Sequence, residues 1–270
     1  MEPDLAAPAI RLIAIGAAMF AFGSLLFAEL TKTDAPPPRA AIAISLAASI
    51  LAALIWAAEV AGPLMSLQRV AHVLSVTLIG KAWLFHVGAA AALAACALRW
   101  PRRRRLLSAL AALSLSSFAP IGHAAASDGA AQVIRILIQA IHLLGAGFWL
   151  GALPLLVRRL AAGAPAAEHA ASVFSRYATV AVFALVAAGL ANLFFLTGGR
   201  PLAPGSEYAR TLFVKLAVVI GAITLAGLNR FWFSPQGMHR RVGALACVEI
   251  LLLLLAAMLG VKLAMSAPWR

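Results

Sequence analysis

Long apolar runs recur along the whole chain, and they limit its fold more than any other feature. Eight of them are long enough to cross a bilayer, for which a helix needs about 20 residues. They cover residues 9–30, 40–61, 80–98, 106–125, 134–157, 172–196, 211–232 and 243–265. Hydrophobic residues make up 63% of the 270 residues and charged residues 11%, which excludes a water-soluble globule and a disordered chain. The sequence predicts an all-α integral membrane protein, a polytopic bundle of about eight transmembrane helices.

The stretch between the second and third runs interrupts this pattern. Residues 62–79 contain Gln68, Arg69 and His72 and are too polar to span well, so we predict an interfacial or re-entrant piece. Residues 1–98 then hold spans one to three with this segment. Residues 99–270 form a membrane domain of spans four to eight. The two cysteines both lie inside apolar runs, which excludes a disulfide-stapled secreted domain.

Basic residues are concentrated in a few short loops. The chain has 22 Lys and Arg against 9 Asp and Glu, a formal net charge of +13. Thirteen of the 22 fall within 31–39, 99–105, 158–176 and 230–241, and residues 102–105 are all arginine. Short loops rich in Lys and Arg stay in the cytoplasm, so both termini are predicted to face the periplasm. No fold or aromatic platform for nucleic acid accompanies this charge, so we predict no nucleic-acid partner.

Small residues in the fifth span predict close helix packing. Gly147 and Gly151 form a GxxxG pattern, which lets the backbone of another helix approach. This pattern explains how a bundle forms and carries no activity by itself.

Histidines interrupt the apolar runs toward the predicted outer side of the membrane. His86, His123 and His142 lie within spans, and His72 and Glu59 lie at the same side. Ionisable groups are costly in hydrocarbon, so each needs a reason. Imidazoles that converge in a dry place bind metal, ligate haem or relay protons. We predict a metal site built from these five residues. For each histidine alone, a hydrogen bond to a neighbouring helix is the competing interpretation.

Other polar residues form a supporting set. Trp149 lies seven residues after His142 and therefore shares one face of the fifth span with it. Glu249 and Lys215 are ionisable groups inside the last two spans, and Asn192 is expected to hydrogen-bond between helices.

The order of several of these residues resembles a known family. Gly122-His123-Ala124, followed by His142 and Trp149-Leu150-Gly151, is similar to the core of the copper-resistance D (CopD) family of bacterial inner-membrane proteins. The later pattern agrees: Phe174-Ser175-Arg176, Gly189, Tyr208, Lys215, Asn229-Arg230 and Glu249. Ala152 departs from it, because the family usually has a second glycine there. The resemblance covers residues 100–270; the N-terminal third agrees in hydropathy and topology only.

The resemblance implies a role in copper homeostasis. The expected activity is movement of copper, as Cu(I) or Cu(II), from the periplasm across the inner membrane, with a periplasmic copper-binding protein as partner. Cys96 and Cys247 lie near the inner ends of their helices and offer an exit site, since thiols suit Cu(I). The competing interpretation is that both are small buried hydrophobes.

Two other functions stay open at this point. Histidines on facing spans also suit a haem-b membrane oxidoreductase that reduces metal or quinone. The third hypothesis is a non-catalytic scaffold that binds a partner protein. The sequence has no ATP-binding loop, so we exclude an ATPase pump and expect a multi-pass inner-membrane protein that is not an enzyme.

Overall fold

The structure, a computed structural model, describes residues 6–62, 66–121, 129–162, 166–203, 205–234, 236 and 238–265. These residues form helices and no strand, which confirms the all-α class. The elements are α1 (Ala6–Leu30), α2 (Arg39–Ala61), α3 (Leu67–Val76), α4 (Leu78–Arg99), α5 (Arg104–Ser116), α6 (Gly129–Ala161), α7 (Ala166–Thr197), α8 (Glu207–Leu228), the π-helix η2 (Asn229–Phe233) and α9 (His239–Met265).

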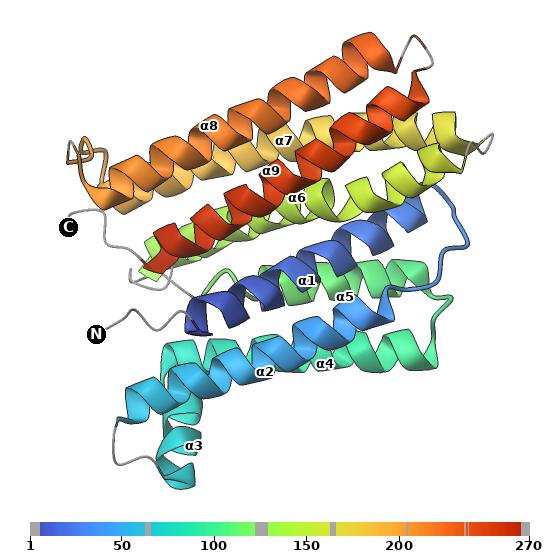
Figure 1. Ribbon diagram of the computed structural model, residues 1–270. Helices are drawn as coiled ribbons and strands as arrows, with labels where there is room; N and C mark the ends of the chain where they lie inside the picture. The colour runs from blue at the N-terminus through green and yellow to red at the C-terminus, as the bar shows by residue number, and fades with distance from the viewer. Residues whose placement is uncertain are drawn as a thin grey trace.

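Helix α1 lies in the middle of the bundle. It packs against α2 and α5 on one side and against α6 and α9 on the other. Figure 1 shows α6 to α9 grouped above α1 and α2 to α5 grouped below it. The bundle therefore consists of an N-terminal group, α2 to α5, and a C-terminal group, α6 to α9, which α1 joins.

Seven helices in the described part of the chain are long and apolar enough to cross a membrane. They correspond to seven of the eight expected spans and make the chain a multi-pass membrane protein. Many of their large apolar side chains face outward, for example Phe183 at 73% exposed and Phe213 at 65%. Such surfaces suit lipid rather than water.

The sequence predicted a full span over 106–125. Over residues 106–121, which the structure describes, this prediction was wrong. Helix α5 has 13 residues and is followed by turns up to Ile121. A helix of this length rises about 20 Å, less than the 30 Å of a hydrocarbon core. Ser117 ends the helix by bonding its hydroxyl to the Ser114 carbonyl, and Pro120 has no N–H to continue it.

The polar stretch after α2 forms the separate short helix α3. Its N-terminus is capped by Ser66, whose hydroxyl accepts from the Arg69 N–H, and it has no buried residue. Gly80 at the start of α4 keeps α3 close, because a side chain there would meet the Val73 and Leu74 carbonyls. In Figure 1, α3 lies across the end of α2 and α4 rather than along them.

The glycine pattern of the fifth span packs as predicted, and its partner is α1. A Cβ built on Gly151 would lie 2.3 Å from the Met19 carbonyl oxygen. A Cβ on Gly23 would lie 2.4 Å from the carbonyl oxygen of Gly147. The Ser24 hydroxyl also donates to the Gly151 carbonyl at 3.0 Å. The α1–α6 contact is therefore backbone against backbone, which only glycine permits.

The predicted inner loops gather at one end of the bundle. Figure 1 places the α1–α2, α4–α5, α6–α7 and α8–α9 junctions together at the right, which we call the arginine-rich end. The start of α1 and the end of α9 lie at the opposite end. That the arginine-rich end faces the cytoplasm stays a prediction from the loop charges.

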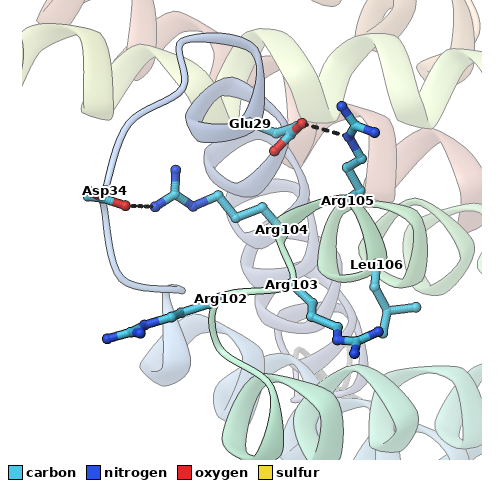
Figure 2. A pocket seen from close by; sticks show the side chains of 7 residues that line it. All are labelled: Glu29, Asp34, Arg102, Arg103, Arg104, Arg105 and Leu106. Carbon is cyan, nitrogen blue, oxygen red and sulfur yellow. Dashed lines mark hydrogen bonds and ion pairs between the residues drawn. The ribbon is translucent and has the colours of Figure 1, made fainter.

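Ion pairs tie the N-terminal helices together at the arginine-rich end. Figure 2 shows Arg104 reaching Asp34 in the α1–α2 loop and Arg105 reaching Glu29 of α1. Lys32 also pairs with Glu29, at 2.8 Å. These pairs are exposed, so they orient the loops more than they stabilise the fold.

Candidate functional site

His86 lies at the centre of the N-terminal group and is fully buried (0% exposed). It stands on α4 and faces α2 and α5. Its Nε2 lies 2.7 Å from the Ser49 hydroxyl, and its Nδ1 lies 2.7 Å from the Ser117 hydroxyl and 3.2 Å from the Ser114 carbonyl. The ring also packs against Phe118, with the ring centres 3.8 Å apart. Both ring nitrogens therefore have polar partners from neighbouring elements.

The two serines that hold His86 are themselves engaged with the backbone. The Ser49 hydroxyl lies 2.6 Å from the Ser45 carbonyl, and the Ser117 hydroxyl lies 2.7 Å from the Ser114 carbonyl. A neutral imidazole and two hydroxyls carry one proton each for this network. Each of those protons has an acceptor, and neither nitrogen is left with a lone pair that faces open space. This arrangement is typical of a histidine that ties helices together.

His142 has a different environment, on α6 against α7. Its Nδ1 lies 3.1 Å from the Leu185 carbonyl. The ring also lies over Gly189, one turn further along α7, where a Cβ would be 3.4 Å from His142 Cε1. A carbonyl only accepts, so Nδ1 carries the proton and Nε2 keeps its lone pair. Within the described part of the chain, Nε2 has no hydrogen-bond partner.

This arrangement matches that of a histidine prepared to bind a metal. Metal-binding histidines almost always donate the second ring N–H to a carbonyl or carboxylate, which fixes the tautomer and the ring orientation. The Leu185 carbonyl does this for His142. The absence of a side chain at Gly189 leaves room for the ring.

Lys215 faces the same region from α8. It is half-buried and lies within electrostatic range of the His142 ring. Its Nζ approaches α9 so closely that a Cβ on Gly260 would lie 3.2 Å from it. Among the described residues, no carboxylate pairs with Lys215. A protonated Lys215 therefore opposes a cation at His142.

Trp149 and Glu249 form a second buried polar contact in the C-terminal group. The Trp149 indole N–H on α6 donates to the Glu249 carboxylate on α9. Trp149 is 0% exposed and Glu249 is 1% exposed. Seven residues along a helix rise about 10 Å, so this contact lies that much nearer the arginine-rich end than His142. His142 and Trp149 thus contact two different helices, α7 and α9.

The predicted interhelical role of Asn192 is confirmed. Its amide N–H on α7 donates to the Gln139 side-chain oxygen on α6 at 2.8 Å. Gln139 lies one turn before His142, so this bond helps to hold the helix pair that carries the imidazole.

The other predicted ligands are scattered. His72 is exposed on α3, and Glu59 is exposed near the end of α2, within electrostatic range of Arg11 on α1. Cys96 on α4 is half-buried and Cys247 on α9 is exposed. Figure 1 shows α4 and α9 on opposite sides of α1, so the two thiols do not share a site. His123 lies outside the described residues.

No group of three or more His, Cys, Asp or Glu side chains comes together in the described part of the chain. His86 belongs to the N-terminal group and His142 to the C-terminal group. Sequence reasoning missed the partners that separate their roles: Ser49 and Ser117 for His86, and the Leu185 carbonyl for His142. The serines inside apolar helices could have indicated the partners of His86. A backbone carbonyl leaves no trace in the sequence, so the partner of His142 could not have been predicted.

Comparison with known proteins assigns the family. Residues 1–133 match the family described as "Copper resistance protein D-like, N-terminal domain", and residues 168–264 match "Copper resistance protein D". A relative from Pseudomonas syringae pv. tomato, named "Copper resistance protein D", is 30% identical over 249 residues, which cover 83% of this chain and 80% of the relative. The chain belongs to the copper resistance protein D family. No solved structure matches it.

The matched regions cover the N-terminal group and helices α7 to α9 of the C-terminal group. The N-terminal match includes α1 to α5, and with them His86, which extends the family beyond the residues that suggested it. The C-terminal match includes Gly189, Asn192, Lys215 and Glu249. His142 and Trp149 lie between the two matched regions, on α6.

Proposed function

We propose that this copper resistance D family protein binds copper in the half of the bundle away from the arginine-rich end and moves it across the bacterial inner membrane. Family membership supports the link to copper. One observation carries the site assignment: His142 has its Nδ1 bonded to the Leu185 carbonyl and its Nε2 unbonded among the described residues. A neutral imidazole in this state is a competent ligand for either oxidation state of copper.

His142 is the first ligand in this proposal. His123 is the second, on the sequence pattern alone, and His72 and Glu59 are exposed groups on the way in. His86 is the weakest candidate ligand, because it binds copper only if Ser49 or Ser117 turns away from it.

The polar groups of the C-terminal group suggest a route. Glu249 with Trp149 lies deeper than His142, and Cys247 lies two residues before Glu249 on the same helix. The Glu249 carboxylate beyond the imidazole gives copper a further ligand toward the arginine-rich end, and Cys247, on the exposed opposite face of α9, is a thiol near the exit. Copper enters this route from a periplasmic copper-binding protein, and the protein acts without catalysing a reaction.

The experiment is copper uptake into proteoliposomes that contain the purified protein, with copper content and absorption recorded together. We expect His142→Ala, alone or with His123→Ala, to lower the uptake rate at least tenfold, because losing a ligand costs more than losing its orienting partner, itself worth about 10- to 100-fold. His169→Ala, an exposed histidine on α7, is the matched control and keeps the wild-type rate.

Two results would contradict the proposal. Wild-type uptake by the double variant removes the site assignment. A Soret band that disappears in His142→Ala, in protein that binds no copper, assigns the histidine to haem instead.

A further inference from the structure

A pocket at the arginine-rich end lies outside the proposed copper route. It has a volume of about 780 Å³ and opens between the α1–α2 loop and the end of α6. Arg39, Arg104, Arg158 and Arg159 lie around it. Its deeper wall is apolar and comes from Phe20, Leu25 and Ala28 of α1 and Leu155 of α6. The pocket therefore combines a cationic rim with an apolar interior.

The rim keeps a surplus of positive charge. Arg104 pairs with Asp34, and Arg159 donates to the Thr33 hydroxyl. Among the described residues, Arg39 and Arg158 have no ion-pair partner. Figure 2 shows Arg104 extended toward Asp34, while the neighbouring Arg102 and Arg103 point away from that pair and from each other. Two guanidinium groups of the rim are thus available to an anion.

The loop that closes the pocket is stiff. Pro36, Pro37 and Pro38 line it directly before α2 begins at Arg39. The ring of each proline fixes its φ angle, so the loop loses little entropy when a ligand binds.

We propose that this pocket binds the headgroup phosphate and one acyl chain of an anionic phospholipid. The phosphate contacts Arg39 and Arg158, and the chain lies along the wall of Phe20 and Leu155. The rim arginines stand at helix ends, Arg39 at the start of α2 and Arg158 in the last turn of α6, which is the depth of the headgroups. Basic pockets between transmembrane helices recognise lipid headgroups by this chemistry. A free phosphate would leave the apolar wall unused.

The test is binding of a fluorescent phosphatidylglycerol to the delipidated protein in detergent, compared with a phosphatidylcholine of the same chains. We expect phosphatidylglycerol to bind more tightly. Arg39→Gln with Arg158→Gln should weaken it about twenty-five-fold, since each arginine near an anionic lipid contributes about a factor of five. Arg102→Gln with Arg103→Gln removes the same charge from the same end without touching this pocket and is the control.

Three outcomes overturn the proposal. Equal binding of the two lipids shows that the net negative charge of the headgroup is not recognised, since both lipids carry a phosphate. Equal weakening by both double variants shows a general attraction of the surface for anions. Competition by glycerol 1-phosphate at the affinity of the lipid shows a site for a soluble anion. Both double variants change exposed side chains, and an unchanged unfolding temperature confirms that each is folded.

Discussion

The two helix groups each hold one histidine that the sequence predicts as a ligand, and its environment differs: His86 is fully buried, whereas His142 is half-buried. In the N-terminal group, His86 is held on both ring nitrogens by side chains of α2 and α5. In the C-terminal group, His142 is held on one nitrogen by a carbonyl of α7, and it faces Lys215, which has no carboxylate partner among the described residues. Two partners on His86 suit a role in the fold, whereas a single acceptor on His142 leaves Nε2 open, which is why we propose His142 as the copper ligand.

The two groups also differ in how far their outer helices are buried. Over their apolar windows, α2 and α4 of the N-terminal group each have 33% of residues buried, whereas α7 and α8 of the C-terminal group have 6% and 11%. Helices α7 and α8 therefore present more of their length to the surroundings of the bundle. His142 lies where the well-buried helix α6 meets the largely exposed helix α7.

The largest expected effect comes from breaking the contact that joins the two groups. Gly151→Leu should destabilise the protein by about 3 kcal/mol or more, because its Cβ alone would lie 2.3 Å from the Met19 carbonyl oxygen. Thermal unfolding in detergent measures this. Gly88→Leu is the matched control, since nothing lies within 4 Å of a Cβ there. Equal loss in both variants would contradict backbone-to-backbone packing.

His86→Ala tests the structural role of the N-terminal histidine. It should lower the free energy of unfolding by about 2–3 kcal/mol, because it leaves a cavity and strands the Ser49 and Ser117 hydroxyls. Phe85→Ala, next to it and 57% exposed, should cost far less in detergent. An unchanged unfolding temperature for His86→Ala would remove the distinction between the two histidines.

Glu249→Ala tests the buried contact of α6 with α9. Losing the acceptor leaves the Trp149 N–H without a partner, which should cost about 1–3 kcal/mol. Glu249→Gln keeps an acceptor and should cost less. If Gln and Ala are equally destabilising in thermal unfolding, the carboxylate charge matters and the hydrogen bond does not.

Lys215→Met sharpens the description of the C-terminal site. Removing an ammonium that faces His142 should tighten copper binding about fivefold at neutral pH, since a like charge nearby opposes the cation. Titration with a competing chelator measures this, and Lys81→Met on α4 is the control. Weaker binding by Lys215→Met would mean that Lys215 supports the site.

The fold followed from the sequence further than the site did. Apolar runs placed seven spans, and Gly147 with Gly151 predicted a close contact. The apolar run over 106–125 led to the wrong prediction of a full span, because serines and a proline end α5 in the middle of this run. The sequence analysis placed His86 and His142 in one site only because both lie at a similar predicted depth in the membrane. Their separation depends on which way each helix turns and on partners such as Ser49 and the Leu185 carbonyl, which no spacing encodes.

We propose that His142, and not His86, holds copper. The most direct test is the copper affinity of the purified protein, titrated under anaerobic conditions against a chelator, for His142→Ala and His86→Ala. We expect at least a tenfold loss for His142→Ala and an affinity within about twofold of wild type for folded His86→Ala. A loss confined to His86→Ala, with His142→Ala unchanged, would contradict it.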